Sequence, residues 1–118
     1  NFNRVPSSII KTDTIRVSEL VENYIGSKKI NLLNIDIEGG EHDIVKDFMN
    51  FKIYPWIICV EEIGMYADSI IKKSEIYKIL SKNSYLFVGR TFLTSIYVHS
   101  DSINKLKSPY IKDLIIEE

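Results

Sequence analysis

The sequence has little of what several protein classes require. Its one cysteine, Cys59, excludes a disulfide within the chain and sits in an apolar run typical of a buried core thiol. The net charge is only -1 and the lysines are dispersed, so neither nucleic acid nor an anionic membrane surface is expected as a partner. The longest apolar run, from Trp56 to Val60, is far too short to cross a bilayer.

Glycine and proline are also scarce, and the motifs that depend on glycine are missing. The chain has five glycines and three prolines. It contains no GxGxxG and no GxxxxGKS or GxxxxGKT segment, so no dinucleotide-binding or phosphate-binding loop is visible. No spacing of cysteine and histidine supports a zinc site. No secretion signal is visible either, which favours the cytoplasm.

Length and composition indicate a single globular unit. The chain has 118 residues, of which 45% are hydrophobic and 26% charged, which is typical of a soluble protein with one core. The first residue is Asn1 and not methionine, which is compatible with a piece of a longer protein. We predict one partial domain over residues 1–118, with residues 102–118 as a terminal segment.

The stretch from Ile30 to Glu41, which reads INLLNIDIEGGE, organises the chain. Its apolar, branched run over residues 30–37 ends at a pair of glycines, a pattern that predicts a buried strand. The following apolar residues recur at helical spacing and predict a helix over residues 40–50. Because ligands bind at the carboxyl ends of strands in open α/β sheets, Asp36 and Glu38 are candidate functional residues.

A second strand that ends in acids follows. The segment from Trp56 to Val60 is apolar on both faces, as in a parallel sheet, and it leads into Glu61 and Glu62. Strand and helix alternate at the spacing of βαβ units, which predicts an α/β fold with parallel core strands. A closing antiparallel hairpin and helices on both faces of the sheet complete the predicted fold. The remaining predicted elements are an extended segment over 9–17, helices over 18–26 and 75–82, and hairpin strands over 85–88 and 92–99.

Parallel neighbours bring their carboxyl ends to the same rim of a sheet. Asp36 and Glu38 are therefore expected within a few ångströms of Glu61 or Glu62. Such a cluster of oxygen atoms suits a hard cation such as Mg²⁺, or it supplies a general base with a raised pKa. Each acid can equally cap a backbone N–H or pair with a lysine. His42, beside this corner, is a candidate base or ligand, although a solvated helix position is the commoner role.

The segment NLLNIDIEGGEHDIVKDF, residues 31–48, resembles the "LLKIDVEGAExxVLKG" segment of FkbM-type S-adenosylmethionine-dependent methyltransferases. The I-D-V/I-E-G core is the specific part of this likeness, which covers about residues 12–101. One departure is Ser84-Tyr85, where the family usually has Gly-Tyr. The supporting segments are DTIRVSELVENY, Pro55 with WIICVEE, EIYKILSKNSYLFVGRT and TSIYVHSD.

The resemblance implies the carboxyl-terminal half of a Rossmann-like methyltransferase, whose glycine-rich loop for the methyl donor would lie upstream. It implies an O-methyltransferase acting on a hydroxyl of a sugar, glycan or small metabolite, with S-adenosylmethionine as the cofactor and Mg²⁺ as a further candidate. Asp36 and Glu38 fall on the family's signature acids and are the expected catalytic residues, with Asp36 also near the methyl donor. Glu61 falls on the acid of the next strand. Glu61, Glu62 and His42 are the expected substrate contacts, and Asp36, Glu38 and Glu61 the expected metal ligands.

Two alternatives stay open, and one physical consequence follows. Asp36-Ile37-Glu38 also resembles the acid-x-acid metal motif of a glycosyltransferase, and a truncated domain could serve as a non-catalytic binding module. If a preceding strand is missing, residues 30–37 form an unpaired apolar edge, and such edges recruit partners or aggregate. We therefore expect association through that edge or poor stability. We also expect these 118 residues to be inactive alone, because methyl transfer requires a precisely placed donor.

Overall fold

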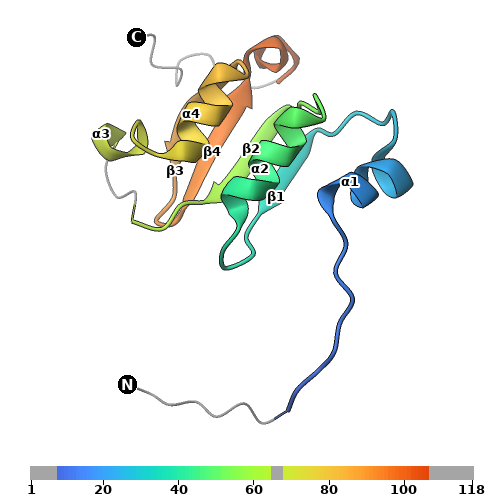
Figure 1. Ribbon diagram of the computed structural model, residues 1–118. Helices are drawn as coiled ribbons and strands as arrows, with labels where there is room; N and C mark the ends of the chain where they lie inside the picture. Colours follow the sequence, from blue (N-terminus) through green and yellow to red (C-terminus); the bar gives the residue numbers. More distant parts are fainter. Residues whose placement is uncertain (1–7, 65–67, 107–118) are drawn as a thin grey trace, which may run out of the picture.

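A four-stranded mixed sheet forms the centre of the computed structural model, which describes residues 8–64 and 68–106 (Figure 1). The strands are β1 (Leu32–Ile35), β2 (Ile57–Glu61), β3 (Tyr85–Arg90) and β4 (Thr94–His99), in the spatial order β1-β2-β4-β3. The pair β1 and β2 is parallel, whereas β4 runs antiparallel to both β2 and β3. The predicted α/β fold, with parallel strands followed by an antiparallel hairpin, is confirmed.

Two helices pack against this sheet. They are α2 (Glu41–Asn50) and α4 (Glu75–Lys82), close to the bounds that the apolar spacing predicts. The shorter elements are α1 (Val17–Leu20), a π-helical turn η1 (Val21–Ile25), α3 (Asp68–Ile71) and a 3₁₀ helix η2 (Ser100–Lys105). We expected helices on both faces, but within the described residues α2 and α4 both lie on the same face (Figure 1).

Alternation along the strands explains why one face carries the core. Ile58 and Val60 of β2 and Tyr97 of β4 are buried against α2 and α4, where they meet Phe48 and Leu80. The residues that alternate with these along β2 and β4 point to the opposite face of the sheet. Cys59 is one of these, and it is only half-buried, whereas the sequence indicated a buried core thiol. Partial burial still raises the pKa of the Cys59 thiol above its usual value.

Strand β1 lies at one edge of the sheet. Its Ile35 is buried, but Leu32 is 58% exposed and Asn34 is also exposed. The Ile57 N–H donates to the Asn31 carbonyl at 3.0 Å, so by alternation the backbone groups of Leu32 and Asn34 point away from β2. Among the described residues no strand pairs with β1 on that side. The expected edge is therefore present, and association through it stays a prediction.

The two ends of the chain are described only in part. Residues 8–16 have no regular secondary structure, and most of the predicted terminal segment, residues 107–118, lies outside the described residues. Within the part that the structure describes, no helix has the length and apolar character needed to span a bilayer.

Candidate functional site

A sharp corner joins β1 to α2. Three successive residues, Glu38, Gly39 and Gly40, have φ angles of 58°, 124° and 97°. Glycine adopts this left-handed region freely, whereas Glu38 accepts it at a cost of about 1 kcal/mol or more. The chain thereby turns directly from the strand into the helix, and the side chains next to the turn stay at the rim of the sheet.

Glu41, in the first turn of α2, holds this corner together. Its Oε1 accepts the backbone N–H of Gly39 at 2.9 Å and that of Ile37 at 3.3 Å. The hydrogen bond from Gly39 lowers the pKa of Glu41 below its usual value. The helix N-terminus also favours a negative charge at this position. Glu41 is therefore an acid that shapes the corner; its place in the first turn of the predicted helix is confirmed, but it was not among the predicted site residues.

Three carboxylates meet at the carboxyl ends of β1 and β2. Oxygen atoms of Asp36, Glu38 and Glu61 lie within 4.8 Å of one another, and we call this group the acid cluster. Asp36 and Glu38 are exposed, and Glu61 is half-buried. The register explains the meeting, because Ile35 is paired with Val60 and the next residues along the two strands are Asp36 and Glu61. The structure thus brings together the three predicted metal ligands, whose roles stay predictions.

The electrostatics of the acid cluster favour a proton or a cation. Partial desolvation raises the pKa of the Glu61 carboxyl, and the negative charges of Asp36, Glu38 and Glu41 raise it further. A carboxyl with a raised pKa holds a proton more readily and is a stronger base when ionised. The cluster can therefore take a proton from a hydroxyl or hold a cation with oxygen ligands.

Glu62 occupies a different environment from its neighbour Glu61. Its side chain is 6% exposed, and its carboxylate accepts the Tyr97 hydroxyl at 2.8 Å and the Ser74 hydroxyl in a short hydrogen bond. Ser74 is also the N-cap of α4 and accepts the Tyr77 N–H at 3.1 Å. Burial, together with the charge of Glu62, raises the pKa of Tyr97 well above its usual range. Glu62 therefore ties β2 to β4 and α4.

The predicted substrate contacts are consequently divided between two places. Adjacent residues of a strand point to opposite faces, so Glu61 joins the acid cluster while Glu62 turns towards the helices. His42, whose Nδ1 lies 3.3 Å from Asp43 Oδ1, is near Glu62 and not in the acid cluster. A cavity of about 350 Å³ lies there, between the first turns of α2 and α4. It is lined by His42, Glu62, Ile63, Ser74, Glu75 and Ile76.

Arg90 is a second residue whose part in the site the sequence did not reveal. Its Nη2 donates to the carbonyl oxygens of Glu62 at 3.3 Å and Phe92 at 3.2 Å, and its Nε donates to that of Thr91 at 3.2 Å. The side chain therefore fastens the turn between β3 and β4 to the end of β2. Its Nη1 is buried and has no hydrogen-bond partner among the described residues.

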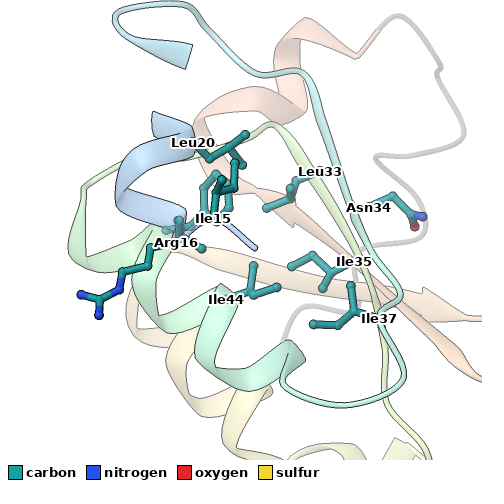
Figure 2. A pocket seen from close by; sticks show the side chains of 10 residues that line it. Ile15, Arg16, Leu20, Leu33, Asn34, Ile35, Ile37 and Ile44 are labelled. Atoms are coloured by element: carbon teal, nitrogen blue, oxygen red, sulfur yellow. The ribbon is translucent and has the colours of Figure 1, made fainter. Parts of the chain in front are cut away.

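A second cavity, of about 230 Å³, lies between α1, β1 and α2 (Figure 2). Leu33, Ile35 and Ile44 point into it, whereas the side chains of Arg16 and Asn34 point away. Among the described residues no polar side chain points into this space, so it has the character of loose packing and not of a reaction site. Its lining residues are Ile15, Arg16, Val17, Leu20, Leu33, Asn34, Ile35, Ile37, Ile44 and Phe48.

The fold places the acid cluster at the carboxyl ends of two parallel strands, which is the end of the sheet where open α/β folds commonly bind ligands. Residues 1–87 of the 118 match the family described as the methyltransferase FkbM domain. The chain therefore belongs to the FkbM methyltransferase domain family. The match includes β1, the glycine corner, α2, β2 and α4. No curated protein and no solved structure matches the chain.

Methyltransferase families generally use S-adenosylmethionine as the methyl donor, so the residues that could contact it are of interest. Asp36 is the residue that the resemblance places near the donor, and the sequence contains no GxGxxG segment of the kind that cradles one. The part of Asp36 in donor binding stays a prediction. A divalent cation fits the acid cluster better. Octahedral Mg²⁺ with ligands at about 2.1 Å needs oxygens within about 4.2 Å of one another. The oxygens of the acid cluster, which lie within 4.8 Å of one another, are close to this spacing.

Proposed function

We propose that this chain is the carboxyl-terminal, acceptor-facing part of an S-adenosylmethionine-dependent O-methyltransferase. The acceptor is a hydroxyl of a sugar, a glycan or a small metabolite. The observation that carries the proposal is the acid cluster, which gathers Asp36, Glu38 and Glu61 at the rim formed by the family's signature segment. The donor-binding part is expected upstream of residue 1, in the segment that the resemblance implies.

The carboxylates divide two tasks in this proposal. When bound, S-adenosylmethionine would supply a methyl group from its sulfonium and would leave as a neutral thioether. Asp36 and Glu38 orient the acceptor at the rim. Glu61, whose pKa burial and neighbouring charge raise, takes the hydroxyl proton as the new oxygen–methyl bond forms. The positive charge of the sulfonium and the proton are thus both accounted for.

A divalent cation is compatible with the same residues. Asp36, Glu38 and Glu61 would hold it through one oxygen each, and the ion would offset their mutual repulsion. Its chemical contribution would be to lower the pKa of a bound hydroxyl, which would ease the loss of the proton that Glu61 takes in the metal-free version. Activity that survives a chelator would assign the proton to Glu61.

Ligand binding to the natural protein that contains these residues separates this proposal from the alternatives. We propose to follow backbone amide resonances over residues 36–41 while adding S-adenosylhomocysteine, or a nucleotide diphosphate with Mn²⁺. Saturable shifts with S-adenosylhomocysteine, lost in the Asp36→Ala, Glu38→Ala double variant, support the methyltransferase. Shifts that require the nucleotide and Mn²⁺ would instead indicate a glycosyltransferase. A protein partner whose binding survives the double substitution would indicate a binding module.

A further inference from the structure

The cavity of about 350 Å³ between α2 and α4 lies beside the end of β2, on the face of the sheet that these helices cover. The acid cluster lies at the same end of β2, but Glu61 and Glu62 point to opposite faces, so the two places are separate. Pockets that hold small ligands have volumes of about 300–1,000 Å³, and this cavity falls at the lower end of that range. We call it the helix-side cavity.

A buried carboxylate, that of Glu62, forms part of the cavity wall. Its Oε1 accepts the Ser74 hydroxyl and its Oε2 accepts the Tyr97 hydroxyl, so each oxygen has one neutral donor. An ionised carboxylate accepts up to about four hydrogen bonds, which leaves acceptor positions unused. Because the two hydroxyls hold the carboxylate in place before a ligand arrives, little side-chain freedom is lost on binding.

The other two titratable side chains in the cavity wall have charged partners. Glu75 accepts a hydrogen bond from the Lys78 ammonium, and His42 Nδ1 lies 3.3 Å from Asp43 Oδ1. Within residues 8–64 and 68–106, no ion pair involves the Glu62 carboxylate. Glu62 is therefore the acid of this wall that lacks a cation.

Two positive groups near Glu62 offset its charge only in part. The Arg90 Nη2 atom donates to the main-chain carbonyl of Glu62 at 3.3 Å and not to its carboxylate. The first turn of α4, which Ser74 caps, adds the positive end of a helix, equivalent to about half an elementary charge. A buried carboxylate without a cation partner is costly, so a cation that enters the cavity relieves this cost.

We propose that the helix-side cavity binds a primary ammonium group carried on a compact apolar skeleton. The ammonium donates hydrogen bonds to the unused acceptor positions of Glu62 and supplies the missing positive charge. Ile63 and Ile76 also line the cavity and offer apolar contacts to the carbon atoms next to the nitrogen. This inference goes beyond the proposed function and requires no methyl transfer.

Burial favours Glu62 over the acid cluster as the partner of such a cation. Asp36 and Glu38 are exposed, and an ion pair in water contributes little. Glu62 is 6% exposed, and the attraction between opposite charges is stronger where water is excluded. A metal ion fits the cavity less well, because Glu62 is not in the group of possible metal ligands that meets within the described residues.

A matched pair of probes tests the inference on the natural protein that contains these residues. Cyclohexylammonium and cyclohexanol share one ring, but only the first is charged at neutral pH, as a lysine side chain is. We expect cyclohexylammonium to bind about tenfold or more tightly, the ratio that a hydrogen bond to a charged group provides. Titration of the amide resonances of Ile63, Ser74 and Ile76, at constant ionic strength, measures both affinities and locates the binding.

Substitutions at one exposed position of the wall separate charge from shape. Ile63 is 63% exposed, so changes there leave the core intact. Ile63→Lys places a competing ammonium at the cavity and should weaken cyclohexylammonium binding at least about fivefold. Ile63→Met, of similar length but uncharged, should change it less than about twofold. Glu61→Gln, which removes a charge from the opposite face, should also change it less than about twofold.

Several results would overturn the inference. They are equal affinities for the two probes, no binding of either, shifts confined to residues 36–38 and 61, or an Ile63→Lys protein that binds cyclohexylammonium as tightly as the wild type. Binding of S-adenosylhomocysteine is a separate readout, so the proposed function can survive any of them.

Discussion

Removal of one hydroxyl should show how strongly Glu62 holds the rim together. In Tyr97→Phe the buried Glu62 carboxylate loses the hydroxyl that donates to it at 2.8 Å and keeps the one from Ser74. The Tyr97 side chain is fully buried, so water cannot replace the lost donor without opening the core. A hydrogen bond to a charged group contributes about 1.5–3 kcal/mol, so we expect the free energy of unfolding to fall by about 2 kcal/mol.

Urea unfolding at neutral pH, followed by circular dichroism, measures this loss. Tyr77→Phe is the matched control, because its half-buried ring lies near that of Tyr97 on the same side of the sheet, with centroids 6.5 Å apart. We expect the control to change the unfolding free energy by less than about 0.5 kcal/mol. The double variant Tyr97→Phe, Glu62→Gln should lose less than the two single changes added together. A Tyr97→Phe protein as stable as the wild type would refute the assigned role of Glu62.

Three further predictions follow from the corner and the edge. The pKa of Glu41 is lowered in the fold, so its carboxylate stabilises the protein at pH values above its usual pKa of 4.5. This stabilisation is lost as the pH falls through the lower pKa of the folded state. Glu41→Gln should therefore flatten the acid side of a plot of melting temperature against pH. Gly40→Ala should destabilise the protein by about 1–2 kcal/mol in urea, because the added Cβ meets only Ile37 Cδ1 at 3.5 Å and the cost is the φ of 97°. Leu32→Lys, on the exposed edge of β1, should reduce the concentration-dependent association that light scattering measures, with little change in melting temperature. A wild-type protein that is a stable monomer at all concentrations would count against the edge as an association site.

The local part of the site could be predicted because its signals are local. The apolar run up to Ile37 and the Gly39-Gly40 pair indicate the strand and its corner, and the spacing after Glu41 indicates α2. The parallel arrangement of β1 and β2 then brings Asp36 and Glu61 to one rim, as the βαβ spacing predicts.

The distinction between Glu61 and Glu62 could not be predicted in the same way. The two hydroxyls that bind Glu62 belong to Ser74 and Tyr97, which lie 12 and 35 residues further along the chain. No local pattern indicates which of two adjacent acids will turn towards them. The serine before α4 does have the sequence signature of an N-cap, but that signature says nothing of its second bond to Glu62.

The expectation of helices on both faces shows a similar limit. The apolar run WIICV has the composition of a strand covered on both sides, yet Cys59 is only half-buried. Strand composition indicates what a face can pack against, but not whether that partner lies within the same stretch of chain. Among the described residues, the only long helices, α2 and α4, share one face.

Methyl transfer by the natural protein that contains these residues tests the central claim most directly. The measurement is turnover from labelled S-adenosylmethionine to a hydroxyl acceptor, compared between the wild type and the Asp36→Ala, Glu38→Ala variant, with the melting temperatures of both as the control for folding. The account predicts a fall in kcat of about a hundredfold or more at an unchanged melting temperature, the size expected when the acceptor is no longer oriented. Turnover that persists near the wild-type rate in a folded variant would contradict it.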